Sequence, residues 1–169
     1  MVTRVLGIDP GSRVTGYGLV DAEGNSYRYV ASGVIRTQSA AFPERLRVIF
    51  TDLGSLITEY GPGVMAVEQV FVQKNASAAL KLGQARGAAL CAGVTRGLDA
   101  AEYTPRAVKQ ALVGTGSAGK AQVAAMVARL LDIHTAMAED ATDALAVALC
   151  HVHQTPLQQR LQAHAGGRS

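Results

Sequence analysis

Four acidic side chains stand at positions from which they could act on a common substrate. Asp9 and Glu68 each end a short apolar run, and Asp140 and Asp143 lie three residues apart near the carboxyl end of the chain. Residues three apart in a helix share one face, so Asp140 and Asp143 could address one point. Carboxylates that are brought together repel one another, and a divalent cation is the usual remedy. The set therefore indicates a metal site built from oxygen ligands.

These oxygen ligands have no matching set of His or Cys residues, which favours Mg²⁺ or Mn²⁺ over zinc. Two such ions about 4 Å apart would activate a water and stabilise the leaving oxygen of a phosphodiester, which is nuclease chemistry. Each acid taken singly has an ordinary interpretation, as a helix cap or as a solvated carboxylate. The order of the acids, two at strand ends and then a helical pair, favours the metal site because ribonuclease H-like nucleases have this order.

The segments that carry these acids alternate between two patterns of hydrophobic residues. Strands are predicted for Arg4 to Asp9, Thr15 to Asp21, Tyr27 to Thr37, Val64 to Glu68 and Ala100 to Tyr103. Helices are predicted for Phe42 to Tyr60, Ala76 to Gly97, Pro105 to about Val113, Lys120 to Asp132 and Asp140 to about His153. The alternation predicts an α/β domain with helices around a mixed sheet, whose first three strands are antiparallel.

Length and composition limit the possible classes of protein. A chain of 169 residues predicts one domain, which we place at residues 1–154, followed by a flexible tail at residues 155–169. The net charge of +3 permits a nucleic-acid partner without proving one. No apolar run approaches the roughly 18 residues of a membrane span, and the N-terminus lacks a signal-peptide pattern. We therefore expect a cytoplasmic protein without a membrane partner, and we expect Cys91 and Cys150 to be buried, reduced thiols.

Several long strings of residues resemble the RuvC family of Holliday junction resolvases. They are Gly7 to Gly18, Glu68 to Phe71 followed by Lys74 to Ala76, Leu80 to Gly87, Val108 to Gln110, and Asp140 to Ala146. The resemblance runs from the first strand to about His151. It implies a ribonuclease H-like fold with a five-stranded sheet, a homodimer, two divalent metal ions per active site and symmetric paired nicks across four-way DNA junctions. Such an enzyme would serve homologous recombination and DNA repair, leaving 5′-phosphate and 3′-hydroxyl ends.

The resemblance also implies roles for individual residues. By position, Asp9, Glu68, Asp140 and Asp143 match the family's catalytic, metal-binding acids. DNA-binding roles follow for residues in two regions, although lysines are more often simply solvated; these residues are Phe71, Lys74, Asn75, Lys109 and Lys120. Phe71 matches the aromatic residue that the family uses against unpaired bases. Family members also act with the RuvA–RuvB branch-migration complex and prefer a thymine-containing cleavage sequence.

Two other functions stay open at this point. The glycine-rich loop from Gly114 to Gly119, which precedes Lys120, approaches the P-loop and dinucleotide-binding patterns and would suit a small nucleotide-binding phosphotransferase. However, Ala121 stands where a P-loop needs Ser or Thr, and a helix rather than a strand is predicted before the loop. We prefer a flexible loop that presents Lys120 to phosphate. The other alternative is a catalytically silent junction-binding scaffold, which the presence of all four acids disfavours.

Overall fold

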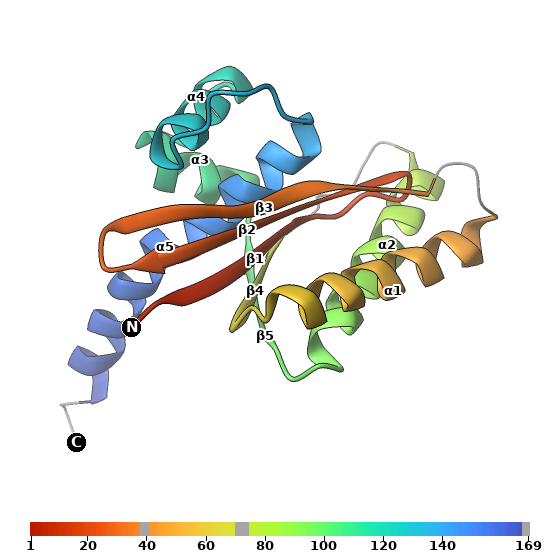
Figure 1. The fold of residues 1–169 in the computed structure, drawn as a ribbon, viewed down its shortest axis with the longest axis horizontal. Helices are drawn as coiled ribbons and strands as arrows, with labels where there is room; N and C mark the ends of the chain where they lie inside the picture. Colours follow the sequence, from red (N-terminus) through yellow and green to blue (C-terminus); the bar gives the residue numbers. More distant parts are fainter. Residues whose placement is uncertain (38–40, 70–74, 167–169) are drawn as a thin grey trace.

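The computed structural model describes residues 1–37, 41–69 and 75–166 and consists of a sheet with helices on both faces (Figure 1). Its strands are β1 (Thr3–Asp9), β2 (Val14–Glu23), β3 (Ser26–Arg36), β4 (Val64–Glu68) and β5 (Asp99–Tyr103). Its helices are α1 (Phe42–Tyr60), α2 (Ala76–Val94), α3 (Pro105–Val113), α4 (Lys120–Leu130) and α5 (Glu139–Gly166). The predicted α/β class, with its mixed five-stranded sheet, is confirmed.

The order of the strands in the sheet is β3-β2-β1-β4-β5. The first three strands are antiparallel, whereas β1 and β4 run parallel, as do β4 and β5. Because β1 and β4 run parallel with Ile8 opposite Val67, the residues that follow these two come to the same edge of the sheet. Those residues are Asp9 and Glu68.

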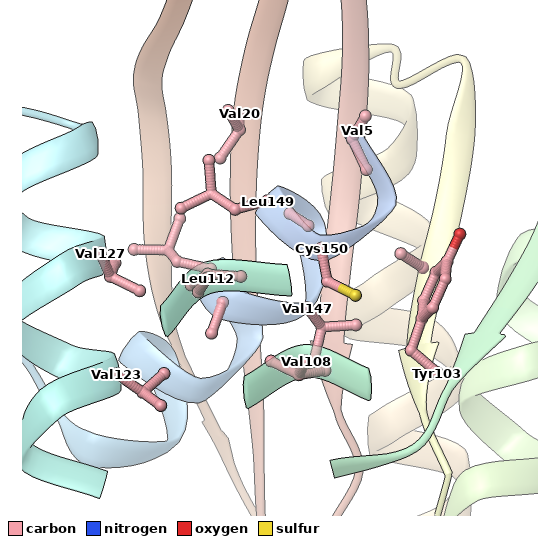
Figure 2. Packing of buried hydrophobic residues seen from close by; sticks show 14 of the residues in the cluster. Val5, Val20, Tyr103, Val108, Leu112, Val123, Val127, Val147, Leu149 and Cys150 are labelled. Carbon is pink, nitrogen blue, oxygen red and sulfur yellow. The ribbon is translucent and has the colours of Figure 1, made fainter. Parts of the chain in front are cut away.

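The alternation of side chains along the central strands supplies two hydrophobic cores, one on each face of the sheet. Leu6 and Ile8 belong to the core beneath α1 and α2. Val5 and Val20 belong to the other core, where they meet Leu149 of α5 and apolar residues of α3 and α4 (Figure 2). All five side chains are fully buried, so α5 is fixed firmly against the sheet.

Glycines in β1 and β2 allow α5 to lie directly on these strands. A Cβ atom on Gly7 would come within 2.0 Å of the backbone oxygen of Ala144, and one on Gly16 would come within 1.9 Å of the backbone oxygen of Asp140. Gly18 pairs with Gly7 across the two strands and also faces α5. No side chain could be accommodated between helix and sheet at these points, so the backbone of α5 approaches as closely as it can.

The C-terminal helix extends farther than its hydrophobic pattern predicted. We expected it to end near His153, but α5 continues to Gly166. Pro156 does not end the helix, because the residues after it are mainly Leu, Gln, Ala and Arg, which are good helix formers. The flexibility expected for residues 155–169 and the domain end at residue 154 stay predictions. Over the described ranges, no helix combines the length and apolarity that a membrane crossing requires.

One side of α2 exposes small and apolar residues. Leu80 and Val94 are 68% and 58% exposed, and a Cβ atom on Gly83 or Gly87 would meet nothing within 4 Å. Cys91 lies on the same side and is exposed, so the prediction that it is buried was wrong, whereas Cys150 is buried as predicted. We call these five residues the α2 stripe.

Candidate active site

A cleft at the carboxyl ends of β1 and β4 collects the four predicted acids. Asp9 comes from β1, Glu68 from β4, and Asp140 and Asp143 from the first turns of α5. The cleft has a volume of about 310 Å³ and is lined by Asp9, Glu68, Pro105, Val108, Lys109, Lys120, Val123, Asp140, Asp143 and Ala146. Residues from five elements, distant in the chain, therefore meet around one hollow.

Hydrogen bonds in the turn after β1 hold Asp9 in place. The hydroxyl of Thr15, which is 1% exposed, donates to the backbone oxygen of Gly11 at 2.9 Å. Thr37 donates from its hydroxyl to the backbone oxygen of Ser12 at 3.0 Å. Since both acceptors belong to the turn and both donors come from the flanking strand region, the turn is tied down on each side. Asp9 therefore stands at a fixed strand end.

The acids of the cleft are electrostatically unfavourable to one another. Burial, followed by the charges of Glu68, Asp143 and Asp140, raises the pKa of Asp9 to about 8. Burial and the charge of Asp143 also raise the pKa of Glu68, which accepts a hydrogen bond from the Asp9 carboxyl group. Burial raises the pKa of Asp143 as well. With a pKa of about 8, Asp9 holds its proton at neutral pH, as expected for a buried carboxyl group among other acids.

Two lysines form the basic side of the cleft. Lys120, at the start of α4, forms an ion pair with Glu139 and lies with its Nζ atom 3.4 Å from Oδ2 of Asp143. The hydrogen bond to Glu139 is the main reason that the pKa of Lys120 is raised. Lys109, from α3, lines the cleft, and its charge opposes the rise in the pKa of Glu68 that burial causes. The cleft thus offers positive charge at its rim and negative charge at its floor.

The donor chemistry of the cleft fits a hard divalent cation, although the side chains are not arranged as a finished ligand shell. In the part of the chain that the structure describes, no three Asp, Glu, His or Cys side chains are positioned to hold one metal ion together. Asp9 and Glu68 hydrogen-bond to each other, and Asp143 faces Lys120. The donors are all carboxylate oxygens, and a divalent cation would offset the burial and the mutual repulsion that raise the pKa values of Asp9, Glu68 and Asp143. Binding would require the side chains to exchange these present partners for the ion.

The comparisons with known proteins agree with this geometry. The model of the family described as crossover junction endodeoxyribonuclease RuvC matches residues 5–151. The chain belongs to the RuvC family. The RuvC of Alkalilimnicola ehrlichii is 58% identical over 159 residues, which cover 94% of this chain and 96% of that protein. The resemblance seen in the sequence is therefore confirmed.

Solved RuvC-like structures share the fold. The structure of Thermus thermophilus RuvC in complex with a Holliday junction substrate is 33% identical, with a TM-score of 0.87, and the match covers 92% of this chain and 96% of that one. The yeast mitochondrial Holliday junction resolvase has a TM-score of 0.71 at 13% identity, covering 98% of this chain and 84% of that one. The latter likeness supports the fold alone, and together the two confirm the predicted ribonuclease H-like architecture.

Three further residues of this RuvC chain were predicted to bind DNA. Phe71 and Lys74 fall outside the described residues. Asn75 does not line the cleft; it caps α2, where its side chain accepts a hydrogen bond from the backbone N–H of Ala78 at 3.1 Å. The DNA-binding roles of these three residues stay predictions, and for Asn75 a structural role is visible.

The glycine-rich loop lacks the setting of a nucleotide-binding motif. It follows helix α3, which ends at Gly114 with a φ of 85°, and Gly119 is the N-cap of α4. A P-loop or dinucleotide motif would follow a strand. The structure therefore confirms the helix predicted before the loop and removes the support for a nucleotide-binding phosphotransferase in this RuvC family member.

The sequence interpretation missed two features that shape the site. Gly7, Gly16 and Gly18 set how closely α5 approaches, and their alternation in two strands was the signal that could have revealed a helix lying on the sheet. Glu139 pairs with Lys120 at the rim of the cleft. It stands next to Asp140 in the sequence, but nothing in the sequence alone indicates its partner.

Proposed function

We propose that this protein cuts four-way DNA junctions by symmetric paired nicks, through two-metal-ion hydrolysis of a phosphodiester, in homologous recombination and DNA repair. The observation that carries the proposal is the cleft, in which four carboxylates from three elements face two lysines. The chain is also similar over most of its length to relatives named crossover junction endodeoxyribonuclease RuvC. The products would carry 5′-phosphate and 3′-hydroxyl ends.

We assign binding of two Mg²⁺ or Mn²⁺ ions to Asp9, Glu68, Asp140 and Asp143. When bound, these ions would supply an activated water and charge stabilisation at the leaving oxygen. Asp9 interacts with each of the other three acids, so it lies centrally among the residues that would hold the ions. Glu68 and the α5 pair would supply the other carboxylate ligands.

The lysines would receive the phosphate groups of DNA. Lys109 and Lys120 line the same cleft as the acids, so a phosphate held by them lies close to the carboxylates. Glu139 keeps Lys120 at the rim, where a phosphate could take over its place. Phe71 would stack on an unpaired base, a contact worth about 1–3 kcal/mol, with Lys74 and Asn75 in the same segment near the DNA.

In a homodimer, two such clefts would be related by a two-fold axis. They could then nick two DNA strands of the same polarity, as a two-fold symmetric junction requires. We propose that the α2 stripe forms its interface with a second copy of the chain. Two of its exposed members, Leu80 and Val94, are large and apolar, and the intervening glycines leave room for a close approach of another helix. An interface made by one helix face against its own copy is self-complementary, which is the geometry of a two-fold dimer.

The cellular setting follows from the family resemblance. We propose that the enzyme works in the cytoplasm together with the RuvA–RuvB branch-migration complex, and that it prefers a thymine-containing cleavage sequence.

A synthetic immobile four-way junction tests the proposed activity against a linear duplex of the same sequence, each incubated with Mg²⁺ or Mn²⁺. We expect paired nicks in the junction alone, whereas the Asp140→Asn variant should bind the junction with unchanged affinity and leave it uncut, because it retains the lysines but lacks one metal ligand. Wild-type protein that binds junctions without cutting them would instead support the silent scaffold. Tight binding of Mg-ATP in equilibrium dialysis would contradict the nuclease.

A further inference from the structure

The loop between α3 and α4 borders a second hollow, which shares helix α3 with the cleft. This hollow has a volume of about 280 Å³ and is lined by Arg106, Gln110, Thr115, Gly116 and Ser117. Its lining contains a guanidinium, an amide and two hydroxyl groups but no carboxylate. In that respect it is the opposite of the cleft, whose lining includes four acids.

Arg106 is held against the loop between α3 and α4. It is exposed, and within the described ranges it makes no hydrogen bond or ion pair. A Cβ atom on Gly116 would come within 2.6 Å of Cγ and 3.1 Å of Nε of Arg106. The glycine therefore permits the arginine to lie along the loop backbone. Its guanidinium N–H groups remain available, and their planar fork suits the oxygens of a phosphate.

The loop adds hydroxyl groups in a fixed arrangement. The hydroxyl oxygens of Thr115 and Ser117 are 2.9 Å apart, so one donates to the other and the second hydroxyl hydrogen is left for an external acceptor. Gln110 donates from Nε2 to the backbone oxygen of Gly114 at 2.7 Å, which ties the loop to α3. Donors on a fixed frame without a nearby carboxylate form a binding site for an anion.

The position of the hollow indicates which anion it takes. Arg106 precedes Lys109 by three residues in α3, and residues at this spacing are neighbours on a helix surface. Lys109 lines the acidic cleft. Successive phosphates of one strand advance by about 3.4 Å along the duplex axis, so a strand that enters the cleft carries further phosphates within reach of the hollow. The cleft and the hollow are both lined by residues of α3 and could contact the same DNA strand.

We propose that Arg106, with the hydroxyl groups of Thr115 and Ser117, binds a phosphodiester group of the DNA strand next to the one that is cut. The proposal rests on the proposed function and adds a contact outside the cleft. It gives the glycine-rich loop a role in DNA binding, because Gly116 is the residue that makes room for Arg106. The contact reads the backbone of the strand and carries no base specificity.

Junction affinity at several salt concentrations, measured on the full chain in EDTA so that nothing is cut, tests this contact. The Arg106→Ala variant should bind about tenfold more weakly and show a salt slope smaller by about 0.9, the value for one lost phosphate contact. Gly116→Ala keeps the charge but displaces the side chain, so it should weaken binding in the same direction. Arg129→Ala, which removes an equal charge at the far end of α4, should match the wild type.

Two further measurements, of cleavage and of phosphate binding, distinguish this proposal from its alternatives. At a saturating concentration of junction, Arg106→Ala should cut at nearly the wild-type rate, since its cleft is intact. If the wild type itself cuts no junction, the proposed function fails, but the salt slope still tests the contact with Arg106. An unchanged salt slope in a variant with a wild-type melting temperature would overturn the proposal. So would tight binding of inorganic phosphate that depends on Arg106 while junction affinity does not, because the hollow would then take a free anion.

Discussion

Asp21 and Asp9 are two carboxylates on neighbouring strands of one sheet, and their surroundings are opposite. Asp21 is 4% exposed and accepts hydrogen bonds from Nε of Arg4 at 2.7 Å and from Nη2 of Arg28 at 2.6 Å. The hydrogen bond from Arg4 is the largest cause of its lowered pKa. Asp9 has three acids around it and a pKa of about 8.

The difference between these two aspartates indicates that Asp21 has a structural role and Asp9 a functional one. At Asp21 the fold supplies its own cations, and the charge is satisfied inside the protein. At Asp9 the described part of the chain places no arginine on the cleft, and the lysines stand at the rim rather than between the acids. The protein neutralises the buried carboxylate of Asp21 with two arginines. Within the described residues it provides no arginine for the cleft acids, which suits their binding a cation from solution.

The largest loss of cleavage should come from a variant that moves the cleft acids apart without replacing any of them. Gly16→Ala places a methyl group where the backbone oxygen of Asp140 lies 1.9 Å from the Cβ position, so α5 must move and Asp140 with it. A displacement of about 1 Å at an active site costs roughly 10²-fold in rate. We expect junction cleavage to fall by about that factor, and the melting temperature to fall too.

Gly63→Ala is the matched control for this variant. The nearest atom to a Cβ at Gly63 is the backbone oxygen of Arg4, 3.9 Å away, so the same substitution should leave cleavage and melting temperature unchanged. Cleavage at the wild-type rate by Gly16→Ala would show that the position of α5 does not set the geometry of the acids.

The arginine-paired carboxylate should affect folding and leave catalysis unaltered. Asp21→Asn leaves Arg4 and Arg28 without a counter-charge, and because both arginines are partly exposed we expect a loss of about 2 kcal/mol in the free energy of unfolding. Since the pKa of Asp21 is lowered, its contribution is present above its ordinary value of 3.8 and is lost as the pH falls below it. Urea unfolding at pH 7 and pH 3 would measure both effects. Reduced cleavage at full stability would contradict this separation.

The acids and the elements that carry them were predictable from sequence because the signals are local. Asp9 is followed by Pro10 and Gly11, which end a strand abruptly, and Thr104 before Pro105 marks the start of α3 as observed. The expected ends of the strands are within two residues of those in the structure. Capping and turn residues act over a few positions, so no long-range information is needed to place them.

What the sequence could not predict depends on contacts between distant segments. The pairing of Lys120 with Glu139 joins residues on two helices whose relative position is set by the core in Figure 2. Cys91 was expected inside because its neighbours are apolar, yet one face of α2 has no cover in the described protein. In both cases the local pattern is compatible with several packings, and only the assembled sheet selects one.

The smallest of these effects concerns the stability of the metal-free protein. The folded protein keeps a proton on Asp9 up to a pH of about 8, whereas the unfolded chain loses it above the ordinary pKa of 3.8. Stability therefore decreases as the pH rises between these values. Asp9→Asn removes this dependence, so in EDTA at pH 8 the variant should be more stable by roughly 1–2 kcal/mol, or about 3–6 °C in melting temperature, with the gap closing toward pH 4. Mg²⁺ should stabilise the wild type more than the variant. A variant that melts below the wild type at pH 8 without metal would mean that Asp9 is satisfied within the fold, as Asp21 is, and the contrast between the two carboxylates would be lost.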